Sequence, residues 1–276
     1  MTKADQLLWA SVRNHHDQLE ELTPEQAEEL KAAGVVPPKE EAPSPAMMRI
    51  DLHCHSEASP DCSTPLELIP PRCQDRQINI QAITDHNRIW GAQKLKEIVA
   101  KKSRLFPGLQ VIIGEEISTT EGEIVGLFLE KPVEAGLTPE ETIALIKEQS
   151  GLVLVPHGFD PLKRFRLQPE ALERIASQVD IIETFNTRVS RPRWNRAAVA
   201  WARQHGVLMS AGSDAHTLAD IGSAWVEVPR CRLKEPDDLL QALKDGVPVG
   251  EWTFPVVAFL YKTWDRMLRR FGVNPA

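Results

Sequence analysis

Short apolar runs recur along the middle of the chain, and most of them end at a histidine or an acidic residue. The runs are rich in β-branched residues and are bounded by turn-forming residues, which is typical of buried strands. Four of the runs, with the polar residues that end them, cover residues 80–87, 111–115, 152–158 and 179–183. The other two, at residues 48–52 and 207–211, lead directly into histidine-containing motifs. Helical patterns lie between them, at residues 91–103, 169–177, 193–205 and 236–244. Strands that alternate with helices predict βα units and a parallel sheet.

Local start and turn signals add three further elements. Thr64-Pro65-Leu66-Glu67 and Thr138-Pro139-Glu140-Glu141 each combine a capping threonine, a proline in the first turn and a glutamate that can complete a capping box. Both segments therefore predict helix starts. Residues 119–129 predict a β-hairpin that turns at Glu121-Gly122.

The two ends of the chain differ from its middle. Residues 1–36 carry two amphipathic helical patterns, and residues 37–47 form a Pro-rich linker. We expect residues 48–250 to form one barrel domain and residues 251–276 to contribute an amphipathic helix with a basic face. That helix is expected to cap the barrel. Binding of the terminal helices to an acidic protein partner stays open as an alternative, and we do not expect them to bind a membrane.

Composition places the chain among ordinary globular proteins. It has 276 residues, of which 42% are hydrophobic and 26% charged. The net charge of −7 argues against binding to duplex nucleic acid, which requires a basic face. Four cysteines follow no C-x-x-C pattern, so neither a disulfide framework nor a thiolate zinc finger is indicated. The N-terminus lacks the features of a signal peptide, and we expect a cytoplasmic protein.

Histidines and acidic residues are paired two positions apart at the ends of two predicted strands. His53 and His55 follow residues 48–52, and Asp214 and His216 follow residues 207–211. Side chains two apart on a strand share a face, so each pair can reach one cation. A single histidine at a strand end is more often an ordinary core or surface residue. The recurrence at six strand ends indicates a metal site instead, because parallel α/β barrels assemble their active sites from the carboxyl ends of their strands.

Taken together, six motifs resemble the PHP (polymerase and histidinol phosphatase) superfamily. In chain order they are Asp-Leu-His-Cys-His-Ser at 51–56, Ser-Pro-Asp-Cys at 59–62, Thr-Asp-His-Asn at 84–87, Gly-Glu-Glu at 114–116, Pro-His-Gly at 156–158 and Gly-Ser-Asp-Ala-His at 212–216. The resemblance extends from about Arg49 to Gly250. It implies an α/β fold, a distorted seven-stranded (β/α) TIM-like barrel, with up to three divalent metals at its mouth and phosphoester hydrolysis as its chemistry.

The resemblance also implies a set of metal ligands. It places His53, His55, Glu115 and Asp214 around one metal, with Glu115 bridging to a second metal that His157 also binds. Asp61, His86 and His216 would hold a third. Glu183 is the candidate for the remaining ligand of the second metal, and its alternative role is to orient a ligand histidine.

The donor chemistry supports the same interpretation. Five imidazoles and three or four carboxylates form a nitrogen and oxygen site suited to Mn, Fe or Zn, and the resemblance implies two to three such ions. Adjacent divalent ions can activate water and stabilise the oxygens of a phosphoryl displacement. We therefore expect in-line attack by a metal-bound hydroxide, with His216 or Asp61 assisting proton transfer.

Basic residues follow two of the candidate ligands in loops that should line the barrel mouth. Among them Arg188 and Arg164 are the candidates for binding substrate phosphate. The expected substrate is a small phosphorylated metabolite or a nucleotide, either a phosphomonoester or a short or cyclic phosphodiester. Two alternatives stay open: a histidinol-phosphate phosphatase, and a metal-binding regulatory protein without catalysis.

Overall fold

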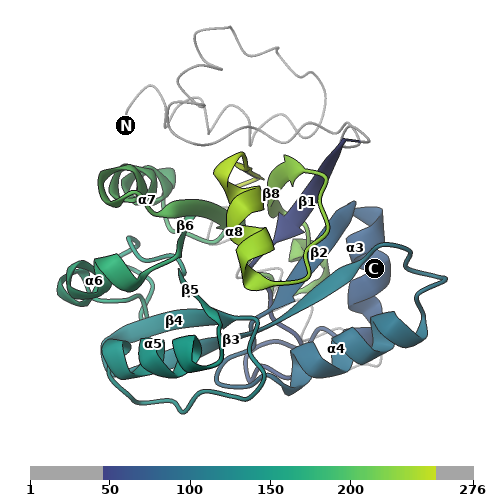
Figure 1. The fold of residues 1–276 in the computed structure, drawn as a ribbon, viewed down its shortest axis with the longest axis horizontal. Helices are drawn as coiled ribbons and strands as arrows, with labels where there is room; N and C mark the ends of the chain where they lie inside the picture. Colours follow the sequence, from purple (N-terminus) through teal and green to yellow (C-terminus); the bar gives the residue numbers. More distant parts are fainter. Residues whose placement is uncertain (1–45, 253–276) are drawn as a thin grey trace, which may run out of the picture.

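The computed structural model describes residues 46–252, which form a mixed nine-stranded sheet curved into a nearly closed barrel (Figure 1). Along the sheet the strands follow the order β7-β6-β5-β4-β3-β2-β1-β8-β9. The strands are β1 Met47–Asp51, β2 Ile78–Ile83, β3 Gln110–Thr119, β4 Gly122–Leu127, β5 Leu152–Val155, β6 Ile181–Asn186, β7 Leu208–Gly212, β8 Ala224–Pro229 and β9 Val247–Gly250.

Parallel pairing dominates the part of the sheet that carries the histidines. Strands β1, β2 and β3 pair in parallel, as do β5, β6 and β7. Strand β4 is antiparallel to both β3 and β5, so it joins these two parallel groups. The residues after β1 and β7 close the barrel: the Asp214 amide donates to the His53 carbonyl at 2.8 Å, and the His55 amide donates to the Ala215 carbonyl at 3.0 Å.

Helices cover the outside of the sheet (Figure 1). Six α-helices lie within residues 46–252: α3 Ile69–Asp75, α4 Trp90–Lys101, α5 Pro139–Glu148, α6 Pro169–Ile175, α7 Pro192–His205 and α8 Pro236–Lys244. Three short 3-10 segments accompany them: η1 Leu66–Leu68, η2 Ala176–Gln178 and η3 Leu218–Asp220. None of the helices in this range is long and apolar enough to cross a membrane.

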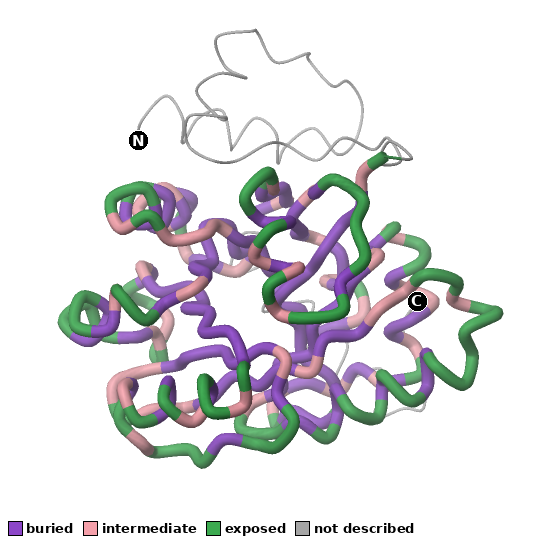
Figure 2. Tube along the Cα trace, viewed as in Figure 1, coloured by how far each residue is buried: buried purple, intermediate pink, exposed green. Residues whose placement is uncertain are grey.

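Both faces of the central strands are buried, which explains their nearly continuous apolar sequences. On β5, Leu152 and Leu154 point into the barrel and belong to the inward-facing hydrophobic cluster. Val153 and Val155 point outward and pack against residues of α5 and α6. A third cluster packs α3 and α4 against β2 and its neighbours. Figure 2 shows the result, with buried residues along the strands and exposed residues on the outer sides of the helices.

The α/β barrel expected from the sequence is confirmed, with corrections in detail. The sheet has nine strands rather than seven: six form two parallel groups, and β4, β8 and β9 join them in antiparallel orientation. The expected hairpin is present as β3 and β4, and Thr138 caps α5 in a full capping box. Thr64 does not cap a helix, since the chain enters α3 through the 3-10 turn η1, whose N-cap residue is Pro65.

The remaining domain predictions concern the ends of the chain. The helical patterns at residues 1–36, nearly all of the linker at 37–47 and nearly all of the C-terminal helix at 251–276 lie outside the described residues.

We expect Phe185→Ala to destabilise the fold by about 3–5 kcal/mol, because Phe185 is fully buried in the inward-facing cluster and its removal leaves a cavity. Chemical denaturation followed by far-UV circular dichroism measures the change. Leu105→Ala is the matched control, because Leu105 is 63% exposed. A loss below about 1 kcal/mol for Phe185→Ala would contradict the central role of this side chain in packing.

Candidate metal centre

The histidine and acidic side chains selected from the sequence converge at one end of the barrel. His53 and His55 follow β1, His86 follows β2, His157 follows β5, and Asp214 with His216 follows β7. These strands run parallel to one another within their groups, so their carboxyl ends deliver the side chains to a common mouth. Four overlapping groups of potential ligand atoms result, and within each group all atoms lie within 4.8 Å of one another.

The first group contains His53, His55 and Asp214. The Nε2 atoms of the two histidines are 3.3 Å apart, and Oδ1 of Asp214 lies 3.5 Å from Nε2 of His55 and 3.9 Å from Nε2 of His53. All three side chains are buried. Two imidazole nitrogens and a carboxylate oxygen therefore face one small volume.

The second group is centred on Glu116. Its Oε2 atom lies 3.4 Å from Nε2 of His53 and 3.3 Å from Nε2 of His55, and its Oε1 atom lies 3.1 Å from Nε2 of His157. The two oxygens of one carboxylate thus face different histidines. This arrangement is suited to bridging two cations.

The third group lies toward solvent and contains His55, Asp61, His86 and His216. Asp61 contacts His216 through Oδ2 at 2.7 Å and His86 through Oδ1 at 3.7 Å. The Asp61 side chain is 37% exposed, whereas His216 is buried. Asp61 therefore has the most solvent-exposed side chain of the four residues in this group.

The structure corrects the assignment of Glu115, because Glu116 occupies the place predicted for it. Successive residues of a strand point to opposite faces, and on β3 it is Glu116 whose side chain faces the histidines. The Glu115 carboxylate instead accepts a hydrogen bond from the Val133 amide at 2.8 Å. The Gly-Glu-Glu motif holds two adjacent glutamates, and the sequence pattern alone did not establish which of them faces inward.

Glu183 also has a different place from the one predicted. Its Oε1 atom lies 3.1 Å from Nδ1 of His53, the ring nitrogen that points away from the cluster. Its Oε2 atom accepts from the His157 amide at 2.7 Å and from the Asn186 side chain at 2.8 Å. Both carboxylate oxygens are therefore engaged in orienting the candidate ligands His53 and His157. This is the alternative role that the sequence analysis left open.

Glu123 was not predicted as a ligand from the sequence, but it lies among the candidate ligands of the metal centre. It contacts His86 Nδ1 at 3.4 Å and His157 Nε2 at 3.9 Å, and it forms the fourth group with His86 and Glu116. The hairpin pairs Glu123 with Ser118, two residues along β3 from Glu116, so both glutamates share one face. A charged residue at the start of the apolar run of β4 was the available signal.

The other nitrogens of the cluster histidines support the interpretation as a cation site. Nδ1 of His53 contacts Glu183, Nδ1 of His55 lies 3.3 Å from the Ser59 hydroxyl, and Nδ1 of His216 lies 2.8 Å from the Asp214 carbonyl. Histidines that bind metals are commonly oriented in this way through the second ring nitrogen. The residues present therefore fit divalent cations held by nitrogen and oxygen donors.

Burial and mutual charge interactions shift the pKa values in the centre. Burial opposes ionisation of Glu116, but His53 and the hydrogen bond with His157 outweigh it and hold the pKa of Glu116 well below its usual range. Burial raises the pKa of Glu123 to about 10, and the charges of Glu116 and Asp214 add to this effect. Carboxylates this close repel each other in a dry environment, and bound cations relieve that repulsion.

Two of the candidate ligands have an uncommon backbone conformation. His157 has φ 31° and Asp214 has φ 48°, both in the left-handed region that non-glycine residues rarely adopt. Gly212, at the end of β7, lies so close to the pair of His53 and Glu183 that an added Cβ would be 2.2 Å from Glu183 Oε1. Backbone strain and close approach therefore coincide at the point where β7 delivers Asp214.

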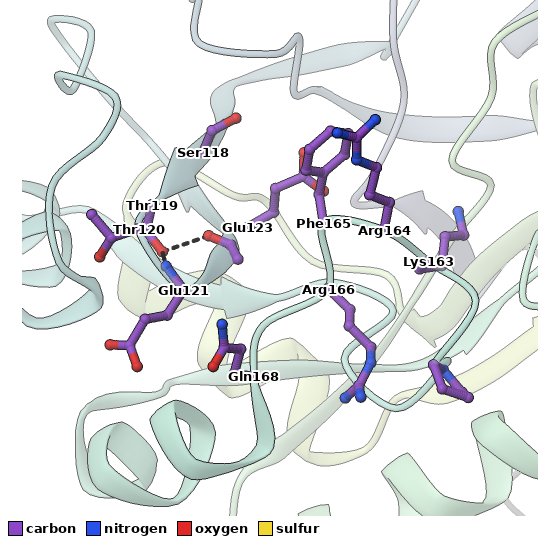
Figure 3. A pocket seen from close by; sticks show the side chains of 12 residues that line it. Ser118, Thr119, Thr120, Glu121, Glu123, Lys163, Arg164, Phe165, Arg166 and Gln168 are labelled. Carbon is purple, nitrogen blue, oxygen red and sulfur yellow. Dashed lines mark hydrogen bonds between the residues drawn. The ribbon is translucent and has the colours of Figure 1, made fainter.

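The two arginines predicted to bind substrate have different surroundings, and Lys163 contacts a candidate ligand. Arg188 is mostly buried, and its Nη1 atom lies 3.5 Å from Asp220 Oδ2. Lys163 places Nζ 2.5 Å from Oδ2 of Asp214. Arg164 instead places its guanidinium 5.1 Å from the centre of the Phe165 ring, and both residues line a pocket (Figure 3).

Two models of known families match the chain. Residues 51–172 match the PHP domain, and residues 192–248 match a model described as PHP-associated. The two matched segments include every residue of the four ligand groups, and Glu183 lies between the segments.

Two similar proteins illustrate the range of relatives. The uncharacterized protein MJ0417 of Methanocaldococcus jannaschii is 32% identical over 197 residues, which cover 70% of this chain and 75% of that protein. A 5'-3' exoribonuclease of Haemophilus influenzae is 38% identical over 108 residues, which cover 38% of this chain and 35% of the exoribonuclease.

Solved structures share the fold at low sequence identity. PsfC from Pseudomonas syringae superposes with a TM-score of 0.59 at 16% identity, covering 79% of this chain and 98% of PsfC. A two-domain Bacteroides vulgatus protein, described as containing a predicted PHP-like metal-dependent phosphoesterase, superposes with a TM-score of 0.58 at 15% identity. That superposition covers 78% of this chain and 70% of the Bacteroides protein.

We expect Glu116→Gln to lower the metal content of the protein, whereas Glu115→Gln leaves it unchanged. Glu116 faces four histidines, but Glu115 faces the Val133 amide, and burial already raises the pKa of Glu115 to about 7. Elemental analysis after reconstitution with Mn and removal of free metal measures the difference. Equal metal loss in both variants would contradict the correction from Glu115 to Glu116.

Glu183→Ala should weaken metal binding by about 10- to 100-fold without changing the number of ions bound at saturation. The reason is that Glu183 orients His53 and His157 and does not belong to the groups of converging ligand atoms. Competition with a chromogenic chelator gives the affinity, and Glu170→Ala, at an exposed position, is the control. Loss of one whole ion at saturation would restore Glu183 as a direct ligand.

Proposed function

This chain belongs to the PHP family, and we propose that it is a metal-dependent phosphoesterase acting on a small phosphorylated metabolite or a nucleotide. The observation that carries the proposal is the sharing of ligands between neighbouring groups. His53, His55, His86 and Glu116 each belong to more than one group, so cations held there would be adjacent. Adjacent cations are the arrangement that phosphoryl transfer uses.

The proposed ligands divide among three positions. His53, His55 and Asp214 would hold one cation, and Glu116 would join it to a second near His157 and Glu123. His55, Asp61, His86 and His216 surround the third position. When bound, the cations supply charge stabilisation for phosphate oxygens and lower the pKa of water.

Protein side chains would perform the remaining tasks. Lys163 and Arg188 bring positive charge beside Asp214 and Asp220, and both are placed in loops at the mouth where phosphate oxygens would lie. Asp61 and His216 are in contact at 2.7 Å, so a proton can pass between them while the third position holds no cation. Because Asp61 is the more exposed of the two, we propose it as the group that exchanges the proton with solvent.

Two features support phosphoesters as the substrate class. The structurally similar protein from Bacteroides vulgatus is described as containing a predicted PHP-like metal-dependent phosphoesterase, and the Haemophilus influenzae relative is named an exoribonuclease. The second name favours nucleotides among the candidate substrates. The alternative of a regulatory protein without catalysis is tested by the same experiment, since it predicts metal binding without turnover.

Purified protein reconstituted with Mn should hydrolyse at least one compound in a panel of phosphomonoesters and of linear and cyclic phosphodiesters. Asp214→Asn should lower kcat/KM by more than about 100-fold, because a direct ligand should matter more than the residues that merely orient ligands. Phosphate release measures the hydrolysis of monoesters, chromatography of the products measures the hydrolysis of diesters, and circular dichroism checks the fold.

Asp245→Asn is the matched control, because Asp245 is exposed and lies outside the centre. Near-wild-type turnover of Asp214→Asn, or metal binding by the wild-type protein without turnover of any compound in the panel, would contradict the proposed function.

A further inference from the structure

A polar pocket of about 370 Å³ adjoins the metal centre, lined by the tip of the β3–β4 hairpin and by the loop after β5. Two of its lining residues also contact the centre: Glu123 through His86 at 3.4 Å, and Lys163 through Asp214 at 2.5 Å. The pocket is therefore adjacent to the position where a phosphate would lie at the centre. Its volume is at the small end of the range for binding sites of small molecules.

One wall of the pocket presents an aromatic ring. Phe165 is 55% exposed although it is a large apolar residue, and the Arg164 guanidinium lies 5.1 Å from its ring centre (Figure 3). A cation against one face leaves the rest of the ring available for another planar group. An exposed ring in a polar pocket is suited to stacking, whereas a lipid tail would require an apolar lining.

The backbone around this ring is fixed by the hairpin. The Glu123 amide donates to the Phe165 carbonyl at 2.8 Å, and the Gln168 amide donates to the Glu121 carbonyl at 2.8 Å. Gly122 allows this close approach, because an added Cβ there would be 2.4 Å from the Arg166 carbonyl oxygen. Strand β4 therefore carries Glu123 into the metal centre and also holds the backbone of Phe165 next to Glu123.

We propose that this pocket binds the planar base of a nucleotide, stacked on Phe165, while the phosphate ester lies at the metal centre. This inference rests on the proposed function and narrows its substrate class. Bases stack on aromatic side chains with little dependence on sequence, because every base has an aromatic face. Gln168 provides a side-chain amide in the same pocket, whereas the Glu121 carboxylate is paired with Arg174 and the Thr119 hydroxyl donates to the Gly122 carbonyl.

The test compares compounds with and without a base. Adenosine 5'-monophosphate, histidinol phosphate and ribose 5-phosphate are assayed as substrates. Phosphonate analogues of the first and third, in which carbon replaces the ester oxygen, serve for calorimetric binding to the Mn-loaded full-length protein. Phe165→Ala should lower the preference for the adenosine compound over the ribose compound by about tenfold or more, in both kcat/KM and binding. Phe165→Tyr should restore it.

Leu162→Ala is the matched control, because Leu162 is 78% exposed in the same loop but does not line the pocket. An unchanged preference in Phe165→Ala, or an equal loss for both compounds, would overturn the inference. A larger loss for histidinol phosphate than for the nucleotide would overturn it in favour of an imidazole ligand. Phe165-dependent binding of the adenosine phosphonate without hydrolysis of any substrate would support the pocket and reject the proposed function.

Discussion

Buried carboxylates and imidazoles within a few ångströms of one another impose the main constraint on this molecule. Glu116 and Asp214 are held as anions by the neighbouring histidines and by Lys163, while Glu123 beside them has its pKa raised to about 10. Removing so much charge from water is costly unless the charges are paired. Second contacts orient several members of the cluster, such as that of Glu183 with His53 and that of Ser59 with His55.

The barrel provides that orientation through the ends of its strands. The segments after β1 and β7 hydrogen-bond to each other, which fixes the distance between His53 and Asp214. The antiparallel strand β4 has a separate role, because it brings Glu123 into the same mouth from the opposite chain direction. A purely parallel barrel would place only the carboxyl ends of its strands there. The mixed sheet therefore adds a ligand that regular βα repetition does not supply.

The sequence allowed the barrel and most of the centre to be predicted, because both depend on short-range periodicity. His53 and His55, or Asp214 and His216, are two residues apart, and the strand period alone brings each pair together. Glu115 was selected instead of Glu116 because a single-residue difference in register reverses the face of the strand, and adjacent glutamates carry no signal to decide it. The position of Glu123 in the metal centre depends on the register between β3 and β4. The role of Glu183 depends on which ring nitrogen of His53 it contacts. Both features are set by tertiary structure, so the strand period alone could not predict them.

The centre and the adjoining pocket share residues, and this limits how far their roles can be separated. Lys163 neutralises Asp214, so an anionic group of a ligand at this position competes with that carboxylate for the same ammonium. Glu123 similarly contacts two candidate metal ligands while lining the pocket. Changes at either residue therefore alter cation binding and ligand binding together. Phe165 differs, because its ring lies beside the Arg164 guanidinium and its carbonyl accepts from the Glu123 amide, so its side chain forms no part of the ligand groups. Recognition of the group beside the phosphate can thus vary at Phe165 while the ligands of the centre stay in place.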